Sequence, residues 1–447
     1  MGRALYSLLL RVALPAQALR YLWRGWRDPA NRGSLRAHLA LGMQPRADRP
    51  LWLHAASVGE VQALTSLVRR LRGDFPGLPL LVTVGTATGL ARARQLLGAL
   101  PALTLREAPW DLPGVARRFM KSAQPCAAVF VETELWPYLL QQSSRAGIPL
   151  LLASARVSER SAGRYRRWAG ALMRDTVRAF TCIGAQTAAD RERFIALGAK
   201  PDAVECWGNL KFDFTPPPDA IARGQALRAR LAAGRPVWVA GSTHAGEEDT
   251  CLAAHASLVR QAQARGAPAP LLVIAPRRPE RFDEVARRVE SKGFALLRHV
   301  GLDDGLVAAD RVAAAQVLLV DQLGELLPYY AAADVAFVGG SLVPVGGHNL
   351  LEPAALARPL LAGPHTGNAP EVAARLEESG ALLRVTDSLS LAGALRELLE
   401  DAAVMRRRGE AAAAVVAAHG GATTRALAAI SAALARQAEP GAYPPAR

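Results

Sequence analysis

Short apolar runs alternate with amphipathic stretches along the chain from Leu51 onward. The runs are nearly continuous in hydrophobic character, as in LWLHA, LPLLVTVG, CAAVFVE, IPLLLASA and AFTCIGA. Continuous apolar runs are typical of strands that are buried on both faces of a parallel sheet. Helical patterns follow these runs, so the sequence predicts a doubly wound α/β domain over residues 50–214, with helices on both faces of its sheet.

The same alternation restarts after a proline-rich stretch. The sequence TPPPD disfavours a helix or a central strand, and we expect a linker over residues 215–220. Apolar runs such as RPVWVAG, PLLVIAP, QVLLVD and DVAFVGG then predict a second parallel α/β domain over residues 221–437, with an Ala-rich helical tail. Two such domains predict a central cleft into which the carboxyl ends of both sets of strands point.

The first 49 residues form a basic segment ahead of these domains. They hold nine arginines and only two acidic residues. Apolar residues recur at helical spacing between residues 3 and 26, while arginines, Pro15 and Gln17 interrupt the stretch. This pattern predicts a helix that lies on an anionic membrane surface, and it fits a spanning helix or a cleaved signal peptide less well. An ordinary helix that docks on the protein is the alternative.

Composition narrows the class of protein and of partner. The chain has 447 residues, 51% of them hydrophobic, and four cysteines that are far apart, which excludes a disordered chain and a disulfide scaffold. Residues 1–219 hold 30 basic and 16 acidic residues, whereas residues 220–447 hold 24 and 23. The first half therefore faces an anionic partner. Aromatic residues make up 6% and do not alternate with basic ones, so we expect no nucleic acid.

Several common chemistries lack their motifs. The stretch GSTHAGE has the glycine spacing of a phosphate loop, but Glu247 stands where lysine is required. The sequence has no dinucleotide fingerprint, nucleophile elbow, H-E-x-x-H or D-x-D pair. These absences favour a mechanism without a cofactor or a metal ion.

The junction HAASVGE connects the first predicted strand to its helix. Ser57 and Glu60 have the spacing of a capping box, which would make the junction a well-formed helix start. The functional alternative is that Glu60 is a general base that deprotonates an acceptor hydroxyl.

Two further junctions of the first domain carry charged residues. Glu132 and Glu134 end an apolar strand, where they either bind a ligand or cap the helix that Pro137 begins. Lys211, one of only four lysines, lies next to the predicted linker, either as a solvated surface group or as a contact to an anion.

The second domain carries the richest junction, GGSLVPVGGHNLLEP. Its glycines allow a close approach, and we expect a helix that begins with Asn349 and Glu352 and that suits a phosphate. Glu352 is placed to accept the hydroxyls of a ribose, and Arg277 offers charge to a phosphate. We expect Gly324 and Glu325 to begin another helix. A single histidine such as His348 is more often structural than catalytic.

Taken in order, HAASVGE, VETELWP, SARVSERSA, GNLKFD, APRRPERF, GELLPYYAAADVAFVGGSL and GGHNLLEPAALARPLLAGPHTGN resemble the Kdo transferases of lipopolysaccharide synthesis. The resemblance runs from the basic segment almost to the tail. It implies an inverting, metal-independent glycosyltransferase of the GT-B fold at the cytoplasmic face of the inner membrane. The implied donor is CMP-Kdo, where Kdo is 3-deoxy-D-manno-octulosonic acid, and the implied acceptor is a lipid A precursor.

The resemblance also implies roles for particular residues. Glu60 matches the catalytic base, and Glu132 and Lys211 match positions that stabilise the transition state. The positions that match CMP-contacting segments are Pro276, Arg277, Leu323, Gly324, Glu325, Asn349, Leu350, Leu351 and Glu352. The alternatives are another GT-B nucleotide-sugar transferase or epimerase, and a basic membrane adaptor without catalytic activity.

Overall fold

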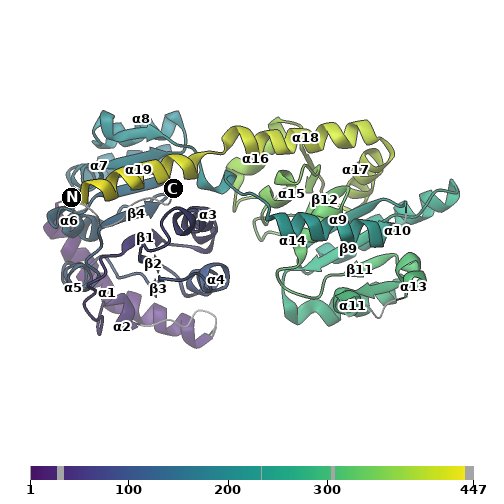
Figure 1. Cartoon of the computed structure of the whole chain (residues 1–447), viewed down its shortest axis with the longest axis horizontal. Helices are drawn as coiled ribbons and strands as arrows, with labels where there is room; N and C mark the ends of the chain where they lie inside the picture. Colours follow the sequence, from purple (N-terminus) through teal and green to yellow (C-terminus); the bar gives the residue numbers. More distant parts are fainter. Residues whose placement is uncertain (1, 28–34, 233, 304–307, 438–447) are drawn as a thin grey trace. The chain divides into compact units, whose positions relative to one another are not determined.

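The computed structural model describes residues 2–27, 35–232, 234–303 and 308–437 (Figure 1). The chain forms two compact units. The first unit comprises Met1–Asp213 and His419–Arg447, and the second comprises Phe214–Ala418.

The first unit is built on a seven-stranded parallel sheet with the order β3-β2-β1-β4-β5-β6-β7. Its strands are β1 (Leu51–Ala55), β2 (Leu80–Val84), β3 (Leu103–Glu107), β4 (Ala127–Val131), β5 (Leu150–Ala155), β6 (Cys182–Ala185) and β7 (Val204–Cys206). The helices are α1 (Arg3–Arg27), α2 (Leu35–His38), α3 (Val58–Asp74), α4 (Ala87–Leu97), α5 (Pro113–Ala123), α6 (Pro137–Arg145), α7 (Glu159–Arg178), α8 (Ala188–Leu197) and α19 (Ala422–Gln437), with short 3-10 turns η2 (Pro201–Ala203) and η3 (Leu210–Phe212). Successive side chains of β1 enter opposite cores: Leu51 and Leu53 pack with α3, α4 and α19, whereas Trp52 packs with α5 and α6.

The second unit repeats this design, with the strand order β10-β11-β9-β8-β12-β13-β14, again all parallel. Its strands are β8 (Val237–Thr243), β9 (Leu271–Pro276), β10 (Leu296–Arg298), β11 (Val317–Leu319), β12 (Val335–Val338), β13 (Leu360–Ala362) and β14 (Leu382–Arg384). The helices are α9 (Pro218–Ala232), α10 (Glu247–Ala264), α11 (Phe282–Ser291), α12 (His299–Asp303), α13 (Ala309–Ala314), α14 (Leu326–Ala332), α15 (Leu351–Ala355), α16 (Pro370–Glu378), α17 (Ser388–Glu400) and α18 (Ala402–His419), with the 3-10 turn η4 (Pro279–Arg281). The predicted pair of parallel α/β domains is confirmed, and both are Rossmann-like.

Two boundaries differ from the sequence-based expectation. The tail was expected to belong to the second domain, but α19 returns to the core of the first unit (Figure 1). Asp213 explains this return, because its carboxylate accepts hydrogen bonds from the amides of Gly421 and Thr423 at the start of α19. The expected linker is also shorter, since α9 begins at Pro218. Proline is tolerated in the first turn of a helix because its missing N–H has no helical partner there.

Helix α1 has one face docked on the first unit and one face exposed. The hydroxyl of Tyr6 donates to Asp111 over 3.0 Å, and that of Tyr21 donates to Glu107 over 3.2 Å. The exposed side chains include eight large apolar ones: Leu5, Leu8, Leu9, Val12, Leu19, Leu22, Trp23 and Trp26. In the described part of the chain, no helix combines the length and apolar character that a membrane crossing needs. The side chains of Arg3 and Arg24 lie outside the described residues.

Candidate active site

The candidate residues of the first unit lie where its strand order reverses. Chain connections run outward in both directions from the neighbouring strands β1 and β4, which makes this the topological switch point of the sheet. Ligands of open parallel sheets bind at the carboxyl ends of such strands. Glu60 follows β1, and Glu132 and Glu134 follow β4, so the topology brings these three carboxylates to one edge.

Glu60 has the helix-capping contacts that its spacing predicts. Ser57 is the N-cap of α3, and its hydroxyl oxygen accepts from the amide of Glu60 over 3.4 Å. The carboxylate of Glu60 accepts in return from the amide of Ala56 and from the Ser57 hydroxyl, the latter over 3.2 Å. These bonds hold the carboxylate in one orientation at the switch point. A capping role and a catalytic role are therefore compatible.

The surroundings of Glu60 favour a basic carboxylate. The residue is 9% exposed, and burial is the largest cause that raises its pKa. The negative charges of Glu134 and Glu132 raise the pKa further, while the hydrogen bond from Ala56 and the proximity of His54 lower it. A carboxylate with a raised pKa binds a proton more readily, which is what a general base requires.

Glu132 is paired with Lys211 from a distant part of the chain. The Nζ atom of Lys211 lies 2.6 Å from Oε1 of Glu132, and the two side chains are 24% and 19% exposed. Glu132 has a φ of 64°, a conformation that is uncommon for residues other than glycine and that is enriched at functional sites. Ser154, with a φ of 50°, accepts at its hydroxyl from the amide of Leu210 and so fixes the turn η3 that carries Lys211.

Glu134 joins a chain of hydrogen bonds that begins in the sheet. Its Oε2 atom lies 3.3 Å from Nε2 of His54 and also accepts from the indole of Trp136. Nδ1 of His54 lies 2.9 Å from the hydroxyl of Thr83. Neither Glu132 nor Glu134 caps α6, the alternative that the sequence left open. Asp111 does so instead, since its carboxylate accepts from the amides of Tyr138 and Leu139.

In the second unit the switch point lies between β8 and β12. Glu247, which follows β8, is fully buried and holds the loop that follows β12. Its Oε2 atom accepts from the amides of His244 over 2.9 Å and Gly340 over 2.7 Å. Its Oε1 atom accepts from Ser341 over 3.0 Å and Leu342 over 2.9 Å. Glu247, which stands where a phosphate loop requires lysine, is therefore a structural anchor. The sequence did not predict this role.

Two histidines and an arginine meet at the same edge. Nε2 of His244 lies 2.8 Å from Nε2 of His348, and the ring planes are nearly parallel, with an interplanar angle of 7° and ring centroids 5.1 Å apart. The pKa of His348 is lowered to about 4, first by burial and then by the positive charges of His244 and Arg277. Arg277 is exposed directly after β9, and its backbone amide donates to Thr243.

The segment Asn349–Glu352 is placed differently from the expectation. Helix α15 begins at Leu351 and has only five residues, so it lacks the long helix dipole expected for phosphate binding. The side-chain Nδ2 of Asn349 donates to Glu352 over 3.0 Å, and its Oδ1 accepts from the backbone amide of Leu351 over 3.1 Å. The side chains of Leu350 and Leu351 are 2% and 4% exposed. These two leucines therefore offer a ligand only their backbone.

The segment Leu323–Glu325 begins α14 as expected. Leu323 is 48% exposed, Gly324 has a φ of 93°, and Glu325 is the N-cap residue. The carboxylate of Glu325 forms an ion pair with Arg223 of α9. Glu325 therefore has a structural partner within the second unit.

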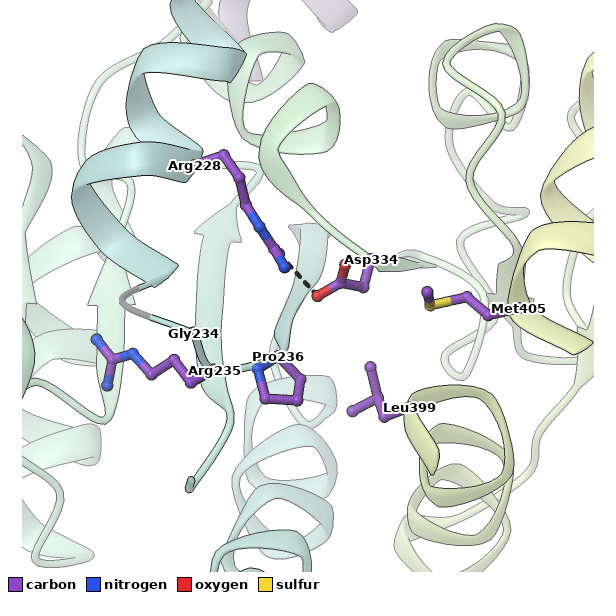
Figure 2. A pocket seen from close by; sticks show the side chains of 7 residues that line it. All are labelled: Arg228, Gly234, Arg235, Pro236, Asp334, Leu399 and Met405. Carbon is purple, nitrogen blue, oxygen red and sulfur yellow. Dashed lines mark hydrogen bonds and ion pairs between the residues drawn. The ribbon is translucent and has the colours of Figure 1, made fainter. Parts of the chain in front are cut away.

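A pocket of about 310 Å³ lies at the opposite edge of the second sheet (Figure 2). It is lined by Arg228, Gly234, Arg235, Pro236, Asp334, Leu399 and Met405. Arg228 and Asp334 form an ion pair of 2.7 Å across it. Asp334 and Pro236 precede β12 and β8, so this pocket lies at the amino ends of those strands and holds none of the candidate residues. Among the described residues, no group of three or more His, Cys, Asp or Glu side chains is placed to hold a metal ion.

Comparison with known proteins assigns the family. The family model of 3-deoxy-D-manno-octulosonic-acid transferase (Kdo transferase) matches residues 33–214. The 3-deoxy-D-manno-octulosonic acid transferase of Bordetella pertussis is 38% identical over 411 residues, which cover 90% of this chain and 92% of the relative. The chain belongs to the Kdo transferase family. A second Kdo transferase, from Haemophilus influenzae, is 37% identical over 350 residues, or 78% of each chain.

A solved structure agrees with the fold. The UDP-GlcNAc 2-epimerase from Neisseria meningitidis bound to UDP-GlcNAc has a TM-score of 0.53 and covers 87% of this chain and 100% of its own, at 13% identity. At this identity the likeness concerns the fold alone. The GT-B fold class is confirmed, and membership of the Kdo transferase family makes the chain a glycosyltransferase.

Proposed function

We propose that this Kdo transferase moves Kdo from CMP-Kdo to a hydroxyl group of a lipid A precursor, with inversion and without a metal ion. The observation that carries the proposal is the cluster at the first switch point. There a buried, oriented carboxylate, Glu60, lies close to Glu134 and Glu132, and Glu132 is bonded to Lys211.

In the proposed reaction, Glu60 accepts the proton of the acceptor hydroxyl. The oxygen forms a bond to the anomeric carbon of Kdo while the bond from that carbon to the phosphate oxygen breaks. CMP leaves with the bonding electron pair, and its phosphate gains negative charge. We assign stabilisation of this charge to Lys211 and Arg277, and support of the transition state to Glu132.

The proposed nucleotide contacts are Pro276, Arg277, Leu323, Gly324, Glu325, Asn349, Leu350, Leu351 and Glu352. Their positions at the end of β9, before α14 and after β12 support this proposal, because all lie at the carboxyl ends of strands or at a helix start. Glu352 and Asn349 offer polar side chains, whereas the buried Leu350 and Leu351 offer amides and carbonyls.

We further propose that the protein works on the cytoplasmic face of the inner membrane, with α1 on the anionic surface. The exposed apolar face of α1 and the exposed Arg11, Arg20 and Arg27 support this placement. The excess of basic residues in the first half suits a phosphorylated lipid acceptor and anionic lipids.

The test is transfer from freshly generated CMP-Kdo to a lipid A precursor with a chelator present, with products resolved by mass. Product in Kdo increments supports the donor, the acceptor and metal independence together. If product forms only without the chelator, metal independence is wrong. If CMP gives no thermal protection while UDP does, another nucleotide sugar is the donor.

A further inference from the structure

The histidine pair joins the two strands that define the switch point of the second unit. His244 directly follows β8, and His348 lies in the loop after β12. The loop is shaped to admit the ring: Gly340 has a φ of 67°, and a Cβ atom there would lie 2.9 Å from Cδ2 of His348. Both histidines are only partly buried. The pair therefore lies at the ligand-binding edge, and solvent reaches it.

The carboxylates near the pair are already bonded. Glu247 accepts four backbone amides, and Glu248 pairs with Arg281 over 2.5 Å. The groups that act electrostatically on His244 are these two glutamates together with Arg277 and Arg278, and those on His348 are His244 and Arg277.

The two arginines at this edge have few ionic partners among the described residues. Arg278 has a single exposed contact there, of 3.6 Å with Glu280. Within the described part of the chain, the guanidinium of Arg277 has no hydrogen-bonding or ion-pair partner. The edge thus has a positive charge and two imidazoles, and it suits an anionic ligand.

The distance between the rings fixes how they share protons. At 2.8 Å, one Nε2 carries a hydrogen and the other accepts it. In the neutral pair, one Nδ1 is a donor and the other an acceptor. Addition of one proton makes both Nδ1 atoms donors, which suits the oxygens of a phosphate. Burial is the largest cause that lowers the pKa of both rings, and Arg277 lowers both further, so the pair is neutral without a ligand.

We propose that His244 and His348 act as one phosphate-binding unit that takes up a proton when the phosphate of the nucleotide binds beside Arg277. The inference rests on the proposed CMP donor and adds two residues to its site. The proton makes the pair cationic, so it stabilises the charge that the departing phosphate gains.

The experiment is calorimetric titration of the full chain with CMP at pH 7.5, in buffers that differ in ionisation enthalpy. At this pH free CMP is almost fully deprotonated, since its phosphate has a pKa of about 6. We expect the wild-type protein to take up roughly half a proton to one proton per CMP. His348→Gln and His244→Gln should bind CMP about 10-fold more weakly, without proton uptake. His365→Gln, at an exposed histidine of the same unit, is the control and should keep the uptake.

The outcomes separate this inference from the proposed donor. If the wild-type protein binds CMP without proton uptake, the histidine inference is wrong while the donor stands. If both glutamine variants keep the uptake, another group takes the proton and the inference is again wrong. If the wild-type protein does not bind CMP, the proposed donor fails and the inference fails with it. Even if the variants do not fold, the wild-type measurement alone can overturn the inference, because CMP binding without proton uptake contradicts it.

Discussion

Replacement of Glu247 by glutamine tests whether this carboxylate anchors the loop after β12. The carboxylate accepts four backbone amides at 2.7 to 3.0 Å. Glutamine keeps one acceptor oxygen, and its NH₂ group would face two N–H donors. Two charge-assisted hydrogen bonds are therefore lost, each worth about 1.5–3 kcal/mol. The neutral side chain costs less to bury, so we expect a loss near the lower end, about 3 kcal/mol.

For a unit of roughly 200 residues, about 3 kcal/mol corresponds to a fall in Tm of roughly 6–12 °C. Differential scanning calorimetry measures this fall, and hydrogen exchange assigns it to the second unit. The control is Glu280→Gln, an exposed carboxylate of the same unit that should leave Tm unchanged. A Tm for Glu247→Gln within about 1 °C of the wild type would refute the anchoring role.

Three further predictions concern the first unit. Because the pKa of Glu60 is raised and its function needs the ionised form, activity should fall as the pH falls through that pKa. Glu134→Gln removes a like charge and should move this acid limb of the pH–rate profile to lower pH, whereas an unmoved limb would contradict the electrostatic effect of Glu134 on Glu60. Asp213→Ala removes the acceptor of two amides and should destabilise α19 by about 1–2 kcal/mol, seen as faster proteolysis of the tail, whereas an unchanged cleavage rate would contradict the capping. Burial raises the pKa of Asp111 from 3.8 to about 6, so between these pH values the native state keeps a proton that the unfolded state has lost. The unfolding free energy of the wild type minus that of Asp111→Asn should therefore fall by about 3 kcal/mol as the pH rises through this range, and a constant difference would contradict the raised pKa.

The sequence predicted those parts of the fold that depend on local patterns. Both series of central strands were visible because parallel strands with two buried faces are continuously apolar. Strand β3 was not singled out, since it is an edge strand with partly exposed, polar positions in LTLRE. The return of α19 to the first unit could not be read locally, because its anchor, Asp213, precedes Gly421 by 208 residues.

The candidate site likewise has contacts that follow from local spacing and contacts between distant residues. The contact between Ser57 and Glu60 follows from a spacing of three residues, and the structure contains it. The ion pair of Glu132 and Lys211 joins residues 79 positions apart, so the sequence singled out each residue separately but no local pattern could pair them. Glu247 and His244 were missed because a failed phosphate-loop motif drew attention to the absent lysine. Their signal was a polar cluster directly after a buried strand.

The central claim is that Glu60 is the catalytic base as well as a helix cap. Glu60→Gln separates the two roles, because glutamine can still accept from the amide of Ala56 but cannot accept the acceptor's proton. Ser57→Ala is the matched control, since it removes the capping hydroxyl and keeps the carboxylate.

The most direct measurement is the rate of Kdo transfer from CMP-Kdo to a lipid A precursor by these two variants and the wild type. For Glu60→Gln we predict a fall in kcat of roughly 10²–10⁴ with Tm almost unchanged, and for Ser57→Ala nearly normal kcat with a loss of about 1 kcal/mol of stability. Wild-type kcat in a folded Glu60→Gln variant would contradict the account and leave Glu60 as a helix cap only.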